Sequence, residues 1–135
     1  MAKESGLAWT TCSVDDSGAV ARAIVNDVVS LDFDTPREEQ DITGIDKSAK
    51  ERLLLLADFS ITLNGVFNDA VNMSHAVFKT VPSTSVARTV SLAVSGQTLA
   101  AEVLFRRYGL TRATNGALTW VSEGANADGT VPTWA

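Results

Sequence analysis

The sequence has 135 residues, of which 45% are hydrophobic and 20% charged, and its net charge is −5 at pH 7. The length fits one domain, residues 1–135, and the composition is typical of a folded protein and excludes a disordered one. The acidic balance argues against a protein that grips nucleic acid, and no apolar run is long enough for a membrane helix, so we expect no membrane binding.

Charge is unevenly distributed along the chain. Residues 1–46 hold ten acidic and three basic side chains, a net charge of −7, whereas residues 47–135 hold six acidic and eight basic side chains, a net charge of +2. This asymmetry suggests two complementary faces that could steer one copy of the chain onto another. The alternative is that the acidic residues are solvated residues of turns and strand edges.

The first third of the chain predicts short strands. Residues 7–14 fit a strand with Trp9 on one face and Cys12 on the other, and residues 15–18 have the composition of a turn. Cys12 has no second cysteine and no basic neighbour, so we expect a small buried or edge side chain. Residues 19–28 suit a strand and a helical turn equally well.

A strand, a loop and a helix are expected next. Residues 29–34 alternate apolar and polar side chains, as strands do, and residues 35–40 form a charged loop around a proline. Asp46 can then accept a backbone N–H and cap a short amphipathic helix. Ser48 with Glu51 offers a second capping register.

From Asp58 the period of the apolar residues changes to two, which predicts a half-buried strand. Gly65 interrupts the apolar row, so we expect a bulge or a close backbone approach there. A second helix is expected where Met73, Val77 and Val81 recur at spacing four. The apolar face of the strand consists of Phe59, Ile61, Leu63 and Phe67.

The last third predicts hairpins. Gly96 suits a tight turn between two alternating strands, and Asn115-Gly116 marks a second hairpin. Trp134 is expected to dock onto the domain's own core or onto a neighbour. In total, six or so strands and two short helices predict a mainly β (α+β) fold: a β-sandwich or open barrel with a flanking short helix and a helix-containing loop.

The residues do not combine into a catalytic, cofactor or metal site. The sequence has no Gly-rich loop leading into a helix and no Gly-x-Ser-x-Gly motif, and its single histidine, His75, lacks the further ligands that a metal needs. Adjacent carboxylates such as Glu38-Glu39 would point to opposite faces of a strand. Arg106-Arg107 lies in a predicted strand, where neighbouring side chains diverge. We therefore expect neither an enzyme nor a nucleic-acid groove.

Residues 41–69 combine a Thr-Gly turn, a Lys-Ser-Ala-Lys-Glu-Arg segment, a Leu-Ala-Asp step and a Leu-Asn-Gly-Val-Phe-Asn strand end. This stretch resembles the tail tube (major tail) proteins of long-tailed, siphovirus-type bacteriophages. The resemblance extends to residues 26–31, 74–78, 91–105 and 128–134, and so covers nearly the whole chain. The order and spacing of these segments carry it.

The resemblance implies a structural virion protein with a tail-tube-like fold and no cofactor. Six copies would close into a hexameric ring barrel of about 24 strands, roughly 45 to 50 Å across, and the rings would stack into a tube through which double-stranded DNA passes. The implied partners are further copies of the chain, the tape measure protein and the tail tip or terminator proteins. The subunit would be assembled in the host bacterial cytoplasm and located in the virion tail.

The resemblance also implies roles for particular segments. The hairpin at residues 87–107 would belong to the lumen sheet, and the loop and helix at residues 35–52, with the termini, would contact a neighbour or the next ring. The expected lumen-sheet residues are Val90, Leu92, Val94, Leu99, Val103 and Phe105. The expected assembly contacts are Pro36, Arg37, Glu38, Glu39, Asp46, Lys47, Lys50, Arg52 and Trp134.

Two alternatives stay open. A tail terminator or baseplate ring on a related fold would form one closed ring and no filament. A monomeric β-sandwich binding module would bind a discrete ligand and would not self-assemble. The sequence does not decide between them because a fold does not fix a function.

Overall fold

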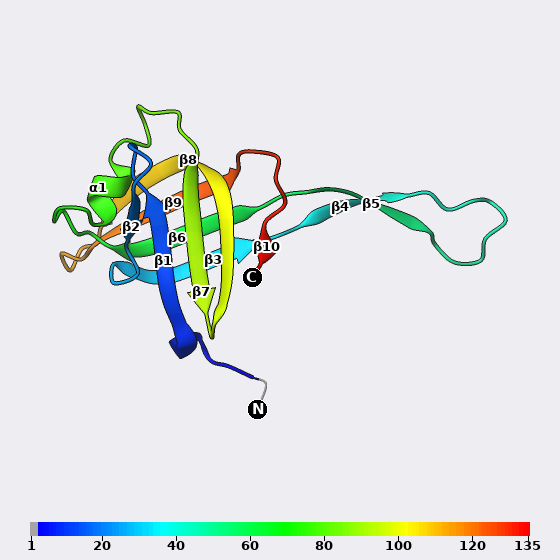
Figure 1. Cartoon of the computed structure of the whole chain (residues 1–135), viewed down its shortest axis with the longest axis horizontal. Coiled ribbons are helices and arrows are strands. Elements are labelled where there is room, and N and C mark those ends of the chain that lie inside the picture. The colour runs from blue at the N-terminus through cyan, green and yellow to red at the C-terminus, as the bar shows by residue number, and fades with distance from the viewer. Residues whose placement is uncertain (1–2) are drawn as a thin grey trace.

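The computed structural model describes residues 3–135. Its body is an open β barrel, from which one long hairpin, residues 37–57, projects to one side; this hairpin is the arm (Figure 1). In chain order the elements are the 3₁₀ turn η1 (Gly6–Ala8), β1 (Trp9–Asp15), β2 (Ala21–Ala23), β3 (Val28–Asp34), β4 (Arg37–Asp41), β5 (Arg52–Ala57), β6 (Ser60–Val66), α1 (Ser74–Phe78), β7 (Arg88–Val94), β8 (Gln97–Arg112), β9 (Leu118–Asn126) and β10 (Thr133–Trp134).

Eight strands form one sheet in the order β2-β1-β7-β8-β9-β6-β3, with β10 paired to β8. The 16-residue β8 belongs to two layers, because its first half pairs with β7 and its second half with β9. The front layer is β2, β1, β7 and the first half of β8; the back layer is the second half of β8 with β9, β6 and β3. The layers cross in Figure 1. Within residues 3–135 the two ends of the sheet, β2 and β3, do not pair, so the barrel stays open.

The hydrophobic core lies between the two layers, and α1 covers one end of it. Phe78 of α1 packs with its ring centroid 5.2 Å from Phe105 and 5.2 Å from Trp120. The alternation predicted for the strands is confirmed in β6, β7, the first half of β8 and most of β9, where every second residue is buried. Examples are Phe59, Ile61 and Leu63 in the back layer and Val90, Leu92 and Leu99 in the front layer.

Two bulges reverse the alternation that the sequence predicts. A register shift between Trp9 and Thr11 turns Trp9 to the same side as Cys12, where it packs against the core. A second shift after Val28 places that residue against the core and leaves Val29 72% exposed. The expectation that Trp9 and Cys12 face opposite sides is wrong, because one extra residue in a strand moves all later side chains to the other face.

The helix expected after Asp46 does not form. Residues 42–51 are a loop, and β5 follows in antiparallel pairing with β4, which occupies most of the expected charged loop at residues 35–40. Pairing thus overrides the helix propensity of the leucine run. The second expected helix exists as α1 but is short, and turns carry the chain on past Val81. Within residues 19–28, Ala21–Ala23 form the strand β2, and residues 25–27 form a turn in which Asp27 donates its N–H to the Ile24 carbonyl oxygen.

Gly65 lies where β6 crosses the backbone of Asp27 and the side chain of Trp120. A Cβ at this position would lie 2.1 Å from the Asp27 carbonyl oxygen and 2.7 Å from the indole. The close backbone approach predicted for Gly65 is therefore confirmed.

We expect Gly65→Ala to lower the free energy of unfolding by about 2 to 3 kcal/mol, because a backbone segment or the buried indole must move to admit the methyl group. Urea denaturation measures the change. Gly6→Ala is the matched control, since a Cβ at Gly6 meets nothing within 4 Å. Equal stabilities of the two variants would contradict the close approach.

Candidate assembly surfaces

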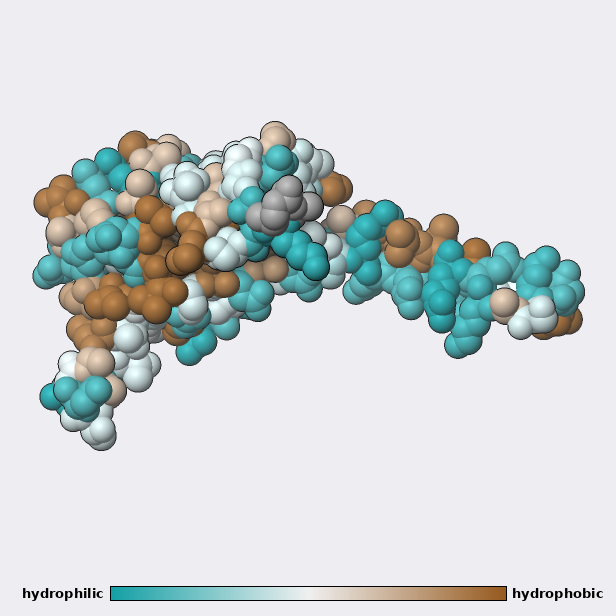
Figure 2. Space-filling model, turned by 90° about the horizontal axis from the view of Figure 1, so that it is seen from below, coloured by the Kyte–Doolittle hydropathy of each residue, from teal (hydrophilic) through white to brown (hydrophobic). Residues whose placement is uncertain are grey.

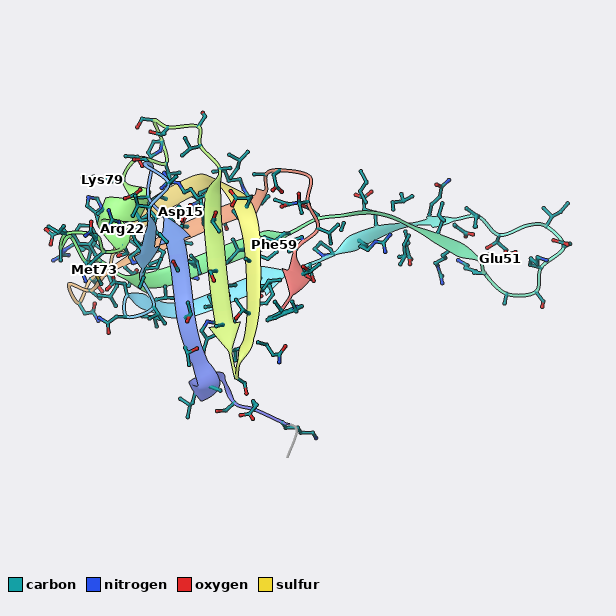
Figure 3. The ribbon with its side chains drawn as sticks, in the orientation of Figure 1. Asp15, Arg22, Glu51, Phe59, Met73 and Lys79 are labelled. Carbon is teal, nitrogen blue, oxygen red and sulfur yellow. The ribbon has the colours of Figure 1, made fainter. Side chains whose placement is uncertain are left out.

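The arm continues the β3–β6 hairpin away from the body. Asp58 donates its N–H to the Pro36 carbonyl oxygen at 2.9 Å, which joins the β3–β6 ladder to the β4–β5 ladder. The far end of the arm carries Glu51 and lies opposite the end of the molecule that holds α1 (Figure 3). Eight of the nine expected assembly contacts lie on the arm or at its base: Pro36, Arg37, Glu38, Glu39, Asp46, Lys47, Lys50 and Arg52.

Polar contacts hold the two strands of the arm together. Arg37 Nε donates to the Leu55 carbonyl oxygen at 3.0 Å, and Arg52 Nε lies 3.4 Å from Glu39 Oε1. Both Arg52 and Glu39 are about half exposed or more, so this ion pair contributes little to stability on its own. The arm is ordered mainly by its backbone ladder.

The loop at the far end is held by Asp41 and Thr43. The Asp41 carboxylate accepts hydrogen bonds from the Thr43 hydroxyl and from its N–H, and these bonds lower the pKa of Asp41. The Thr43 hydroxyl oxygen in turn accepts the N–H of Glu51 at 2.8 Å. The loop therefore keeps a defined shape although all of this group is exposed.

The arm exposes large apolar side chains. Leu53, Leu54 and Leu56 on β5 are 50%, 55% and 88% exposed, and a bulge between Leu54 and Ala57 distributes them over both faces of the hairpin. Ile45 in the loop is fully exposed. Hydrophobic residues are visible among the hydrophilic ones along the arm in Figure 2. A two-stranded hairpin has no core of its own, so these side chains form an apolar surface that nothing in the described chain covers.

The six expected lumen-sheet residues lie on β7 and β8, and all but Val94 are buried in the core. Their side chains point between the layers. The opposite, outward face of the front layer carries small side chains, and its ionisable groups are the carboxylates of Asp15 and Glu102, which accept hydrogen bonds from Thr89. The small residues of this face are Thr11, Ser13, Ser91, Ala93, Thr98 and Ala100.

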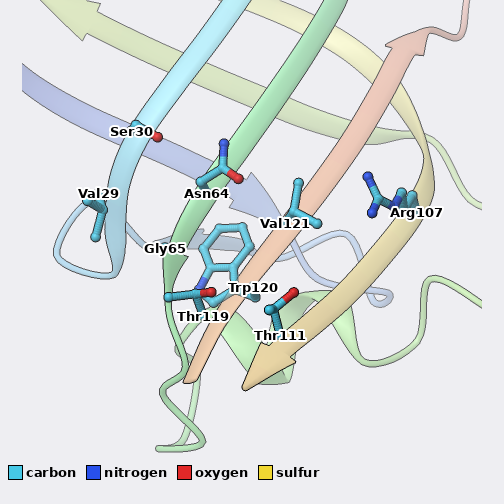
Figure 4. Close-up of a pocket in the computed structure, with 9 residues that line it drawn as sticks. All are labelled: Val29, Ser30, Asn64, Gly65, Arg107, Thr111, Thr119, Trp120 and Val121. Carbon is cyan, nitrogen blue, oxygen red and sulfur yellow. The ribbon is translucent and has the colours of Figure 1, made fainter. Parts of the chain in front are cut away.

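The outward face of the back layer holds a shallow hollow of about 540 Å³ around Trp120 (Figure 4). Arg107 at its rim is 3.6 Å from a carboxylate oxygen of Glu123, and Arg106 is 3.9 Å from the other oxygen. A bulge between Phe105 and Arg107 brings both arginines to one carboxylate, so the expectation that they diverge is wrong. The lining residues are otherwise apolar or neutral and offer no nucleophile with a base beside it.

His75 contacts another side chain, and Cys12 lies in the core. His75 Nδ1 lies 3.0 Å from the Tyr108 hydroxyl, and Cys12 is buried, which raises the pKa of its thiol to about 12. Among residues 3–135, no three His, Cys, Asp or Glu side chains gather to hold a metal ion, and no helix is long and apolar enough to cross a membrane.

The two charge segments are interleaved in space. The boundary at residue 46 falls in the loop of the arm, so acidic β4 pairs with β5. Glu39 with Arg52, and Asp46 with Lys47 at 3.7 Å, each join one residue from either segment. The division of charge along the sequence therefore does not define two separate faces.

Trp134, the ninth expected contact, lies on β10 at the edge of the front layer. Its ring centroid is 5.9 Å from that of Phe33, yet the residue remains 48% exposed. Trp134 thus docks in part on its own domain and keeps half of its surface available.

The sequence analysis missed the exposed leucines of the arm. Four consecutive leucines from Leu53 to Leu56 would project around most of a helix, which is poor amphipathicity, whereas in a strand they cover two opposite faces. That lack of helical periodicity was the available signal for a strand with no core beneath it.

No protein-family model matches the chain, and no curated protein matches it. Among solved structures, it is similar to a chain from the tail of an empty gene transfer agent particle with C6 symmetry, at 17% identity over 98% of this chain and 99% of that one, with a TM-score of 0.73. It is also similar to a chain from the virion of a native gene transfer agent particle, at 15% identity over 98% and 99%, with a TM-score of 0.69.

The structure thus defines a mainly β protein, an open barrel with one flanking helix and a projecting arm. Its fold is that of these gene transfer agent chains over their full length. The mainly β, tail-tube-like fold expected from the sequence is confirmed, with the helix-containing loop replaced by the arm.

Proposed function

We propose that this chain is the subunit of a phage-like tail tube, in which six copies close into a ring and rings stack around a channel for double-stranded DNA. The observation that carries the proposal is the arm, whose apolar side chains have no core within the chain. Its support from known structures is the full-length likeness to a chain of a C6-symmetric tail.

The arm favours self-assembly on energetic grounds. Covering one exposed leucine contributes about 1.5 to 3 kcal/mol, and each copy offers several on one projecting element. The arm does not pack on its own body, since its far end lies away from the body in Figure 1. A second copy of the chain, in the same ring or the next, is the partner that a stacked assembly supplies in every repeat.

The front layer fits a channel wall. Its outward face carries small neutral side chains and two carboxylates, so it offers DNA phosphates no cation to bind. In this proposal the genome slides past this face. The tape measure protein, the tail tip or terminator proteins, assembly in the host bacterial cytoplasm and a location in the virion tail belong to the same proposal.

Negative-stain electron microscopy of the purified protein, concentrated at low and high salt, tests the proposal. We expect tubes of stacked rings with a central channel. Isolated rings would favour the tail terminator or baseplate alternative. A protein that stays monomeric under all conditions would contradict the proposal and favour a binding module.

A further inference from the structure

One edge of the front layer is only partly filled. β2 pairs with β1 at residues 13–15 and leaves residues 9–12 without a paired strand on that side, within the described chain. In this stretch Ile24 donates its N–H to the Cys12 carbonyl oxygen at 3.0 Å. Apart from this bonded carbonyl, the edge of β1 between Trp9 and Cys12 faces no strand of the described chain, so a further strand could pair there.

The other edge of the front layer has the complementary step. β10 pairs with β8 at Leu99 and Ala100, and from Val103 onward β8 turns away to pair with β9. β10 therefore occupies this edge of the front layer beside the first part of β8, and among residues 3–135 no strand of the front layer lies beside the later part. The β8 edge thus has β10 as an additional strand, and the β1 edge has an unpaired stretch beside which such a strand could lie.

Strand direction and level agree across the two edges. β1 is antiparallel to β7, β7 to β8 and β8 to β10, so β10 is antiparallel to β1. Trp134 is opposite Leu99, Leu99 is opposite Leu92, and Leu92 is opposite Cys12. β10 therefore lies level with Cys12 and Ser13, where the pairing of β1 with β2 begins, and the stagger of a tilted barrel brings it beside residues 9–12 of the next copy.

We infer that β10 of one copy pairs with residues 9–12 of β1 in the next copy, so that the sheet of the ring repeats as β1-β7-β8-β10. This inference rests on the proposed ring. Every strand in such a sheet is antiparallel to its neighbours, and β2 of the next copy takes the room that β8 vacates. Four strands from each of six copies give about 24, which matches a barrel wide enough for duplex DNA.

β10 presents backbone groups for this pairing. Ala135 donates its N–H to the Thr98 carbonyl oxygen at 2.8 Å and accepts the Thr98 N–H at 3.0 Å. Because bonded groups alternate along an antiparallel strand, the N–H and C=O of Trp134 point away from β8. They face the direction in which the next copy lies.

In the inferred pairing, an apolar hollow beside β1 of the next copy can accept the side chain of Trp134. Leu99, opposite Trp134, points into the core, so the indole lies on the core side of the front layer. On that side of β1 an apolar hollow of about 450 Å³ opens between β1 and β3, with no charged side chain in its lining. It is lined chiefly by Trp9, Cys12, Val25, Val28 and Leu31. Hydrophobic residues gather on the part of the body away from the arm in Figure 2.

Site-directed cross-linking in assembled protein tests the inference. Thr10→Cys places a thiol on the unpaired edge of β1, and Thr133→Cys places one on β10; both positions are exposed. With a short bifunctional maleimide, the double variant should give a ladder of covalent species up to the hexamer on a denaturing gel. The buried Cys12 thiol stays protonated at neutral pH and does not compete.

The single variants are the controls. Each alone should give no species beyond a dimer, while an equimolar mixture should give dimers that contain one of each. Rings or tubes in the microscope without a ladder would overturn the inference and leave the proposed function standing. A protein that forms no rings at all would overturn both.

Trp134→Ala gives a second, independent readout. It should raise the protein concentration needed for assembly at least about tenfold, as expected for loss of a central tryptophan from an interface. Val131→Ala, at a similarly exposed apolar residue of the same tail, should leave it nearly unchanged. Equal effects of the two variants would count against the hollow as the site of the indole.

Discussion

A chain that carries Leu54→Asp and Leu56→Asp is expected to fold normally and to form no tubes. Both leucines are more than half exposed and lie on the arm, away from the core, so the substitutions remove no contact from the core. In the assembly they would place two carboxylates in an apolar contact. Loss of at least about 3 kcal/mol per contact corresponds to more than a hundredfold rise in the concentration needed for assembly.

Electron microscopy and sedimentation measure the assembly, and urea denaturation measures the fold. The free energy of unfolding should stay within about 0.5 kcal/mol of the parent value, as for other surface substitutions. Gln40→Asp is the control, because it adds a charge to the arm beside Leu53 and removes no apolar side chain. Normal tubes from the leucine variant would show that the arm is not an assembly surface.

Elements with local signals were predicted well from the sequence. The turn between β7 and β8 has φ of 50° at Ser95 and 81° at Gly96, and the turn before β9 has φ of 92° at Gly116, where glycine is favoured. The alternation of β6 also predicted which side chains are buried, because burying one face requires a period of two.

The arm could not be predicted in the same way. Leucine has a high helix propensity, and although the run Leu53–Leu56 lacks helical periodicity, no local pattern identifies β4 as the strand with which it pairs. The bulges at Trp9 and Val28 are single extra residues, and nothing in the composition of either strand marks them.

For the expected lumen-sheet residues, the resemblance indicates strands and does not indicate which side of each strand faces outward. It names β7 and β8 as strands of the lumen sheet, which stays a prediction, and their apolar residues, such as Val90 and Leu92, fill the core. In a two-layered fold the side that is left for a channel is the polar side of each strand. Which face is outward follows from the second layer, and the crossing of β8 between layers appears only in three dimensions.

Arg88 carries the largest expected loss of stability, since it is buried and joins three parts of the fold. It lies on β7 at 1% exposure, and its guanidinium donates to the carbonyl oxygens of Asp15 and Val77 at 3.1 and 2.8 Å and to the Thr80 hydroxyl at 2.9 Å. Burial lowers the pKa of Arg88, while the nearby carboxylates of Asp15 and Asp16 raise it. The group stays charged, and its hydrogen bonds compensate for its burial.

Arg88→Met keeps most of the side-chain volume and removes the donors, so one buried and two partly buried acceptors lose their partner. We expect the free energy of unfolding to fall by about 3 kcal/mol or more, because each unsatisfied buried group costs about 1 to 3 kcal/mol. Arg106→Met is the matched control: its side chain is 61% exposed with one contact at 3.9 Å, and the change should stay below about 0.5 kcal/mol. Because Val77 and Thr80 belong to α1 and the turn after it, hydrogen exchange in this region should rise first. Equal free energies of unfolding for the two variants would show that the hydrogen bonds of Arg88 do not stabilise the contact between α1 and the front layer.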